Sequence, residues 1–451
     1  MKKSPFIREL GLWDAAAIVV GCIIGAGIFR VPSSIAYHLT SPLTILLTWV
    51  LGGLLSMTGA LCYAELSSLF PKTGGDYIYL RETYGHAVGF LFGWTKLFVE
   101  RTGTIAIIAF VFGEYLGYLL GIPKEGTKFV AIFAILALTA ANIIGLRYGK
   151  AIQNIFTSLK VLAIVFIIVL GFAFLPREMQ GGNISSLMKG GPFSWSLIPS
   201  VGMALIFVLW TYGGWTEAAY VAEEIKEPAK NVPVSIIGGL GFVILLYLAI
   251  NTIYYLYIPA AQMKETKLVA SVVVGKILGP WGGKLVALFV ATSTFGALNG
   301  YILTGGRILY ALAEDHALFH KLSAIHSRFH TPFLALCFNG ICAILLVLTK
   351  TFDQLMEYTT IVISIFFALT GLSVIVLRKK LPDAHRPYKV WGYPYIPLVF
   401  AGSTLLFIGN AVFRAPRESF FGFLLVALGF FLYLISRRMD TDSTRHALEK
   451  T

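Results

Sequence analysis

Apolar and polar positions divide this chain into long blocks. Runs of about 20 apolar residues, the length that crosses a bilayer as a helix, are separated by short polar connections. Twelve such runs predict transmembrane helices that begin near residues 14, 42, 87, 128, 153, 199, 233, 284, 332, 354, 394 and 419. The pattern predicts an all-α integral membrane protein that forms a single polytopic domain over residues 1–451.

The first apolar run contains the stretch GCIIGAGIF, which is poor in helix-forming residues. Gly21, Gly25 and Gly27 each lower helix stability by roughly 1 kcal/mol relative to Ala. In lipid, a broken helix is tolerated only where the freed backbone groups line a cavity or meet protein. We therefore predict two half-helices and an unwound hinge at Ile23–Gly27, whose N–H groups suit an anion and whose carbonyls suit a cation. A GxxxG helix-packing face is the alternative.

The sixth apolar run is interrupted in the same way. Gly213 and Gly214 break it, and Trp210 and Trp215 flank the break. The first run is the first span of one five-span half of the chain, and the sixth run is the first span of a second five-span half. Breaks at corresponding places of two halves are typical of inverted-repeat transporters, whose substrate site lies near the midplane of the membrane. Together the breaks predict a site for a transported substrate.

Composition narrows the class of protein. The chain is 57 % hydrophobic and only 13 % charged, which excludes a soluble domain with one core. The net charge of +13 indicates basic connections between the spans, and no nucleic-acid partner is expected. If the N-terminus is inside, the inner connections hold roughly twice as many Lys and Arg residues as the outer ones. Both termini are therefore expected in the cytoplasm. All four cysteines lie in expected spans. The residues suggest no catalytic cluster, cofactor or metal site, so no enzyme is expected.

Several motifs resemble one family of transporters. GCIIGAGIF resembles the G-[ST]-x-I-G-[SA]-G-I-F signature of the amino acid–polyamine–organocation (APC) superfamily. YAELSSLFPKTGGDYIYL, YGGWTEAAYVAEEIKEPAKNVP and FGALNGYILTGGRILYALAEDHALF are similar to the L-type amino acid transporter branch or a close bacterial sister, and RPYKVWGYPYIP is a further family-like stretch. The resemblance covers nearly the whole chain. It implies a LeuT-type 5+5 inverted repeat with discontinuous first and sixth helices.

The resemblance also implies an organisation and an activity. The expected parts are a cytoplasmic N-terminus (1–13), a first five-helix repeat (14–175), a second five-helix repeat (199–380), helices eleven and twelve (393–436) and a cytoplasmic tail (437–451). The implied function is sodium-independent transport of neutral L-amino acids by alternating access, with exchange favoured over proton symport. The alternative of another class is a non-transporting amino acid sensor, against which the short tails argue.

The two breaks are where the resemblance places the substrate. The carboxylate would meet N–H groups at Ala26 and Gly27, and the amine would meet backbone carbonyls. The implied substrate-binding residues are Ile23, Gly25, Ala26, Gly27, Trp210 and Gly213. Trp210 stands at the family's aromatic gate position, with an ordinary packed aromatic as the alternative. Weaker candidates for the pocket wall are Cys22, Phe29, Trp215, Phe295 and Asn299.

Lys160 is the most informative charge inside an expected span, because a lysine at membrane depth is a functional candidate. In the resembling family a lysine in the fifth span stands where sodium-coupled relatives hold an ion, which would make sodium unnecessary. As a residue, it can act as a fixed cation or a proton carrier. The alternative is that it snorkels to the inner interface.

Other charges accompany the breaks. Arg30 and Glu217 each follow a break closely, and they could pair as an outer gate or select the charge of the substrate side chain; solvation of each in an outer vestibule is the alternative. Lys96 and Glu100 stand four residues apart and can pair on one helix face, with Arg101 on another face.

The expected partners are an amino acid substrate and the lipid bilayer. Animal members of the resembling family couple through an outer-loop cysteine to a partner glycoprotein. The connection LGIPKEGTK between the third and fourth spans contains no cysteine, so no disulfide-linked heavy subunit is expected. The expected location is the inner membrane of a prokaryotic cell.

Overall fold

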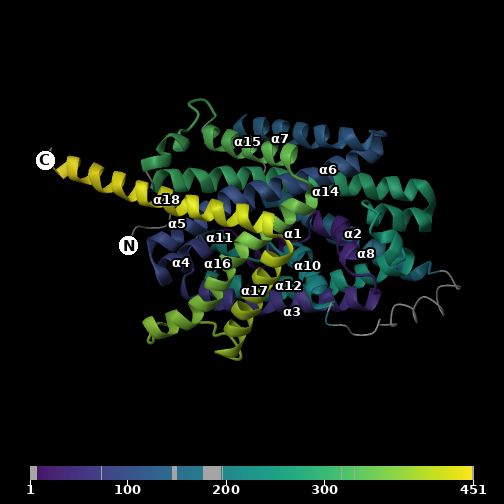
Figure 1. The fold of residues 1–451 in the computed structure, drawn as a ribbon, viewed down its shortest axis with the longest axis horizontal. Coiled ribbons are helices and arrows are strands. Elements are labelled where there is room, and N and C mark those ends of the chain that lie inside the picture. Colours follow the sequence, from purple (N-terminus) through teal and green to yellow (C-terminus); the bar gives the residue numbers. More distant parts are fainter. Residues whose placement is uncertain are drawn as a thin grey trace.

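The structure is a computed structural model of the 451-residue chain (Figure 1). It describes residues 8–72, 74–144, 150–175, 195, 197–315, 317–329 and 331–448. Among these residues the regular elements are helices, accompanied by one isolated bridge between Leu10 and Ile225 and no strand. The prediction of an all-α protein is confirmed.

The helices vary from single turns to rods longer than a bilayer is thick. The N-terminal half contains α1 (Leu12–Ile23), α2 (Gly27–His38), α3 (Pro42–Leu69), α4 (Asp76–Tyr84), α5 (His86–Thr95), the π-helix η1 (Lys96–Arg101), α6 (Thr102–Leu120), the 3-10 helix η2 (Lys124–Gly126), α7 (Thr127–Ile144) and α8 (Lys150–Ala173). The C-terminal half contains α10 (Leu197–Tyr212), α11 (Glu217–Tyr220), the 3-10 helix η3 (Ala222–Glu224), α12 (Pro228–Tyr257), α13 (Ala260–Met263), α14 (Val269–Asp315), the 3-10 helix η4 (Ala317–Ser323), α15 (Phe333–Thr349), α16 (Phe352–Lys380), α17 (Tyr395–Arg414) and α18 (Pro416–Leu448).

Nine helical stretches in the described part of the chain are long and apolar enough to cross a membrane. Three shorter apolar helices lie where the fifth, sixth and ninth spans are expected: Thr157–Ala173, Leu197–Tyr212 and Phe333–Thr349. The eighth predicted start, near residue 284, lies just after Gly279, whose non-helical backbone kinks α14 (Val269–Asp315) and divides it into two helical stretches. α18 continues as a helix to Leu448, through most of the segment expected as a tail. The chain is a multi-pass membrane protein.

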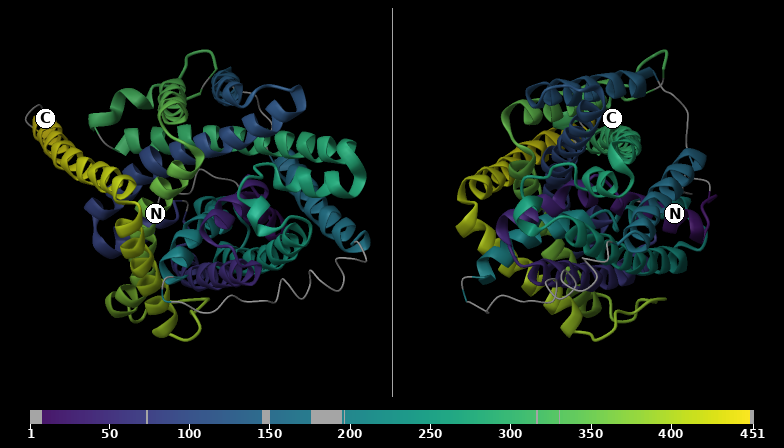
Figure 2. Two further views of the ribbon diagram at one scale, coloured as in Figure 1. Left: turned by 45° about the vertical axis from the view of Figure 1, so that its right-hand side comes forward. Right: turned by 90° about the vertical axis from the view of Figure 1, so that its right-hand side faces the viewer.

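The broken helices lie inside the bundle (Figure 2). α1 and α2 pack against α8, α10 and α12, and α3 packs along α12. The outer helices α7, α15 and α17 instead expose large apolar side chains such as Phe129, Phe133 and Leu406, as expected of surfaces that face lipid. The packing therefore places the interrupted backbone of α1 and α2 away from lipid.

Candidate functional site

The first helix break lies between α1 and α2. α1 ends at Ile23 and α2 begins at Gly27, so the predicted hinge is present. The first N–H groups of a helix have no partner within it, and here they belong to Gly27 and the residues directly after it. Ile23 and Ala26 are almost fully buried. The open start of α2 therefore offers backbone donors inside the protein.

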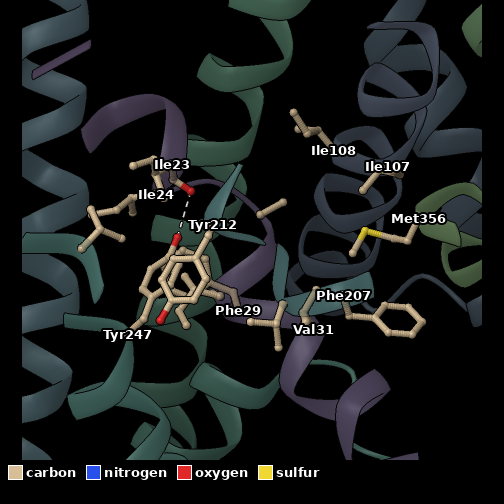
Figure 3. Close-up of a cluster of buried hydrophobic side chains, with 14 of the residues drawn as sticks. Ile23, Ile24, Phe29, Val31, Ile107, Ile108, Phe207, Tyr212, Tyr247 and Met356 are labelled. Carbon is tan, nitrogen blue, oxygen red and sulfur yellow. Dashed lines mark hydrogen bonds between the residues drawn. The ribbon is translucent and has the colours of Figure 1, made fainter. Parts of the chain in front are cut away.

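Side chains from other helices bind the carbonyls at the end of α1. Gly25 donates its N–H to the Ile23 carbonyl at 2.8 Å, which leaves the Gly21 carbonyl for Lys160 Nζ at 3.3 Å. Tyr247 of α12 donates its hydroxyl to the same Ile23 carbonyl at 2.8 Å (Figure 3). Lys160 is buried with 5 % exposure, so it contacts α1 and does not snorkel to the inner interface.

The second break separates α10 from α11. α10 ends at Tyr212, and Gly213 donates its N–H back to the Trp210 carbonyl at 2.9 Å. Gly214 has φ +104°, a conformation that residues with a Cβ rarely adopt. A Cβ on Gly214 would also stand 2.8 Å from the carbonyl oxygen of Cys22. The two breaks are thus in direct contact, and glycine is required where they meet.

One cavity of about 1160 Å³ opens onto both breaks. Fourteen residues were predicted as substrate contacts, pocket wall, cation or gate, and twelve of them line this cavity: Cys22, Ile23, Gly25, Ala26, Gly27, Lys160, Trp210, Gly213, Trp215, Glu217, Phe295 and Asn299. Trp210 is half-buried beside the second break, as a gating ring or a packed aromatic would be. Asn299 accepts a hydrogen bond from Asn142 Nδ2 at 2.7 Å, and the Phe295 ring lies tilted against that of Phe112 at 5.3 Å between centroids. The cavity extends along α11 to Tyr220 and reaches Tyr77 of α4.

Phe29 and Arg30 lie elsewhere. Phe29 is buried in the hydrophobic core, close to Val31 and Phe207 in Figure 3. Arg30 is also buried, and its Nε pairs with Glu114 of α6 at 3.1 Å. The interpretation of Phe29 as a pocket wall is therefore wrong for this conformation, because α2 turns that side chain into the core.

The hypothesis that Arg30 and Glu217 pair with each other is also wrong for this conformation. The Arg30 guanidinium stacks over the Phe352 ring at 4.6 Å from its centroid, and Lys267 joins its partner Glu114 at 3.3 Å. Glu217 lies on the cavity and contacts Arg101 Nη2 at 3.5 Å. Arg30 therefore pairs with α6 on its side of the first break, whereas Glu217 pairs with η1 beside the second.

The charges of the third span converge on Glu217, which the sequence did not reveal. Lys96 pairs with Glu100 at 3.3 Å, as predicted, but it also lies 3.7 Å from Glu217. Arg101 was expected on another helix face. The π-helix η1 widens the turn at these residues, so that Arg101 faces the cavity too. Three charges within six residues of an apolar span were the signal that could have revealed this cluster.

Asp76 is a second residue that the sequence did not single out. It begins α4 and is completely buried. Its carboxylate accepts hydrogen bonds from the hydroxyls of Tyr63, Tyr220 (2.6 Å) and Thr370 (3.1 Å). Burial raises the pKa of Asp76 from 3.8 to about 6, against the opposing effect of these hydrogen bonds. Asp76 thereby ties α11 to α3 and α16.

Glu65 holds a further buried ionic contact at the same end of the molecule. Arg378 of α16 donates two hydrogen bonds to its carboxylate, at 2.8 and 2.6 Å, and the Val390 N–H donates a third at 2.7 Å. Among the described residues, no group of three or more His, Cys, Asp or Glu side chains is placed to hold a metal ion.

The sequence is similar to proteins of one known family. A model of the amino acid permease family matches residues 10–433. The chain is 32 % identical to the b(0,+)-type amino acid transporter 1 of Mus musculus, over 99 % of this chain and 93 % of that protein. It is 31 % identical to the serine/threonine exchanger SteT of Bacillus subtilis, over 90 % of this chain and 91 % of that protein. It is 33 % identical to the large neutral amino acids transporter small subunit 2 of Homo sapiens, over 89 % of this chain and 75 % of that protein. The match includes both helix breaks and the cavity between them, and the chain belongs to the amino acid permease family.

Proposed function

We propose that this protein is a secondary active transporter that exchanges neutral L-amino acids across the cell membrane by alternating access, independently of sodium. The observation that carries the proposal is the contact of two helix breaks in one buried cavity. The N–H groups of Ala26 and Gly27, at the open start of α2, suit a carboxylate. The carbonyls of Trp210 and Gly213 suit an amine, since a carbonyl that already accepts one hydrogen bond retains a second lone pair. The Ile23 carbonyl already accepts two hydrogen bonds, from Gly25 and Tyr247, so it would bind the amine only in exchange for one of them.

The helix packing supports twelve spans in a LeuT-type 5+5 repeat. Helices with the same rank in the two halves contact one another: α2 with α10, α3 with α12, α6 with α14, and α7 with α15. This is the arrangement that two intertwined copies of one unit would produce. We assign residues 14–175 and 199–380 to the two repeats and residues 393–436 to helices eleven and twelve.

The conformation fits the inward-open stage of the cycle. On the side of Arg30, the ion pair with Glu114 ties α2 to α6, and neither residue lines the cavity. On the opposite side, the cavity continues between α4 and α11. Because the excess of Lys and Arg places the connections near α4 in the cytoplasm, the cavity would open to the inside. Both termini would then be cytoplasmic, in a prokaryotic inner membrane.

Lys160 supports independence from sodium. Its ammonium group donates to the Gly21 carbonyl at 3.3 Å, so a cation belonging to the protein already occupies the open end of α1. As a fixed cation it fits an exchanger that reorients only when loaded. Proton symport would instead require Lys160 or a carboxylate to titrate during the cycle.

The names of the relatives favour exchange and leave the partner to be tested. One relative is a serine/threonine exchanger, and another is called a small subunit. The connection between α6 and α7 contains no cysteine that could bind a second subunit covalently, so we propose that the chain works without a disulfide-linked heavy subunit. An amino acid sensor, the candidate of another class, would bind the same ligands without moving them.

The test is uptake of a labelled amino acid panel into proteoliposomes, empty or preloaded with the same amino acids, with and without a pH gradient. Exchange predicts uptake only into preloaded vesicles. Uptake into empty vesicles that follows an inward proton gradient would establish symport instead. Binding without uptake would indicate a sensor, and neither binding nor uptake of any panel member would overturn the proposal.

A further inference from the structure

A ring of four charged side chains faces the cavity beside the second break. Lys96, Glu100 and Arg101 lie on η1, and Glu217 is the first residue of α11. All four line the same cavity as the two breaks. We call them the charged ring. Its position, next to the proposed contacts for the amino acid backbone, is where the substrate's side chain would extend.

The charged ring alternates in sign and has no net formal charge. Glu100 Oε2 lies 3.3 Å from Lys96 Nζ and 3.8 Å from Arg101 Nε. Glu217 Oε1 lies 3.5 Å from Arg101 Nη2 and 3.7 Å from Lys96 Nζ. Tight hydrogen bonds between such groups measure about 2.7–2.9 Å. The four contacts are longer, so donors and acceptors of the ring remain available.

Two atoms of the charged ring show this capacity directly. Arg101 Nε and Glu100 Oε2 are buried and make no hydrogen bond in the described part of the structure. The Arg101 side chain is only 2 % exposed, and its guanidinium is positioned over the ring of Tyr301, 4.9 Å from the centroid. Lys96 is similarly placed over Tyr220, at 5.1 Å. The cations are thus fixed in place while their hydrogen-bonding capacity is incompletely used.

Stability alone gives no reason to keep such a ring. Buried ion pairs often contribute no more than apolar side chains of the same volume, because the charges lose their hydration. An unsatisfied buried donor or acceptor costs about 1–3 kcal/mol. The side chains that carry these two atoms line the cavity, so the ring is better explained as part of a binding site than as a stabilising element.

We propose that the charged ring receives the side chain of the substrate and selects uncharged polar side chains, namely amides and hydroxyls. An amide or hydroxyl donates to a carboxylate of the ring and accepts from its cations without adding charge. A charged side chain would meet two charges of its own sign. An apolar side chain would displace water and leave the buried charged groups without partners. This inference rests on the proposed transport of amino acids and adds the class of substrate.

Near-isosteric amino acid pairs test the selection. Initial rates of exchange in proteoliposomes would be compared for L-threonine against L-valine and for L-glutamine against L-methionine. The ring predicts that each polar member is preferred about 10- to 100-fold, the value of one hydrogen bond to a charged group. If both members of each pair are transported equally well, the side-chain subsite is refuted while the transport function stands. If none of the four is bound or moved, the proposed function itself is in question.

Single and double substitutions separate recognition from a structural role. Lys96→Met leaves the ring with one excess negative charge and should raise uptake of L-lysine relative to L-threonine. Glu217→Gln leaves one excess positive charge and should raise uptake of L-glutamate relative to L-threonine. The double variant restores neutrality, removes two partners and should lose both gains together with much of the preference for threonine over valine.

The control is Lys276→Met, which removes a lysine whose Nζ bonds to the Tyr257 carbonyl at 2.8 Å and which does not line the cavity. Its substrate ratios should match those of the unmodified protein. Melting temperatures of all variants in detergent identify any that fail to fold. Folded Lys96 and Glu217 variants that slow every substrate by the same factor would show a structural ring and overturn the inference.

Discussion

The two helix breaks share one cavity but are held open by different means. At the first break, side chains from other helices bind the free carbonyls: Lys160 binds Gly21, and Tyr247 binds Ile23. At the second break, the chain turns on its own glycines, and Gly214 fits against Cys22 only because it lacks a Cβ. The first break therefore depends on replaceable hydrogen bonds, whereas the second depends on backbone geometry. Substitutions at the second should have the larger effects.

The largest expected effect is that of Gly214→Ala. The new Cβ would stand 2.8 Å from the Cys22 carbonyl at φ +104°, which costs about 1–3 kcal/mol for overpacking and roughly 1 kcal/mol more for the backbone conformation. We expect a lower melting temperature and loss of uptake. Gly238→Ala is the matched control, because Gly238 lies in α12 with open space around it and Ala favours a helix. Equal behaviour of the two variants would contradict the account.

Next in size is Lys160→Ala. Removal of the ammonium group leaves the buried Gly21 carbonyl without its partner and takes the fixed cation out of the site. Exchange should fall about 10- to 100-fold, as expected for loss of a charge-assisted hydrogen bond. Lys276→Ala removes a lysine with the same kind of bond, to the last carbonyl of α12, and should leave exchange nearly unchanged. A comparable loss in both variants would show that Lys160 has no special role.

A smaller effect is expected from Tyr247→Phe. This change deletes one hydrogen bond to the Ile23 carbonyl at 2.8 Å and leaves the ring packing in place. The expected cost is about 0.5–1.5 kcal/mol, measured as a lower melting temperature and weaker substrate binding. Tyr254→Phe is the control, because the buried hydroxyl of Tyr254 has no hydrogen-bond partner in the described structure, and it should be neutral. The reverse order would contradict the account.

The smallest effect is a pH-dependence at Asp76, which holds α11 through Tyr220. Burial raises its pKa from 3.8 to about 6, so the folded state favours the protonated form. The free energy of unfolding therefore falls as the pH rises from about 3.8 to about 6. Above about pH 6 the full cost of ionising the buried carboxyl is present. Besides Tyr220, the groups around it are Tyr63, Tyr79, Thr370 and the cation of Lys96.

Asp76→Asn removes the cost of ionising a buried carboxyl. The melting temperature of the variant minus that of the unmodified protein should therefore be about 2–4 °C higher at pH 7.5 than at pH 4.5. Measurement of melting temperature at both pH values compares the same two proteins, so any constant effect of the amide cancels. A difference that does not change with pH would refute the assignment.

Local sequence signals predicted the breaks and most of the cavity. Glycines at Gly25, Gly27 and Gly213 disfavour helix wherever they occur, so both breaks could be predicted without knowledge of the fold. The partners of charged residues could not. Arg30 pairs with Glu114, which is 84 residues away, and no local pattern encodes which helices pack together.

The charged ring illustrates the same limit within one helix. The spacing of Lys96 and Glu100 predicted their pairing, because an α-helix brings residues four apart onto one face. Arg101 joins them only because η1 is a π-helix, whose wider turn shifts the following side chain. A pattern read with the α-helical period therefore assigned Arg101 to the wrong face.

The central claim is that both breaks together bind the backbone of an amino acid. The most direct measurement is inhibition of exchange by the best-transported amino acid, its methyl ester and its N-acetyl derivative, in the same proteoliposomes. Because the open start of α2 requires a free carboxylate and the carbonyls require a free amine, only the unmodified amino acid should inhibit. Equal inhibition by either blocked derivative would show that the corresponding break does not contact the substrate, and would contradict the account.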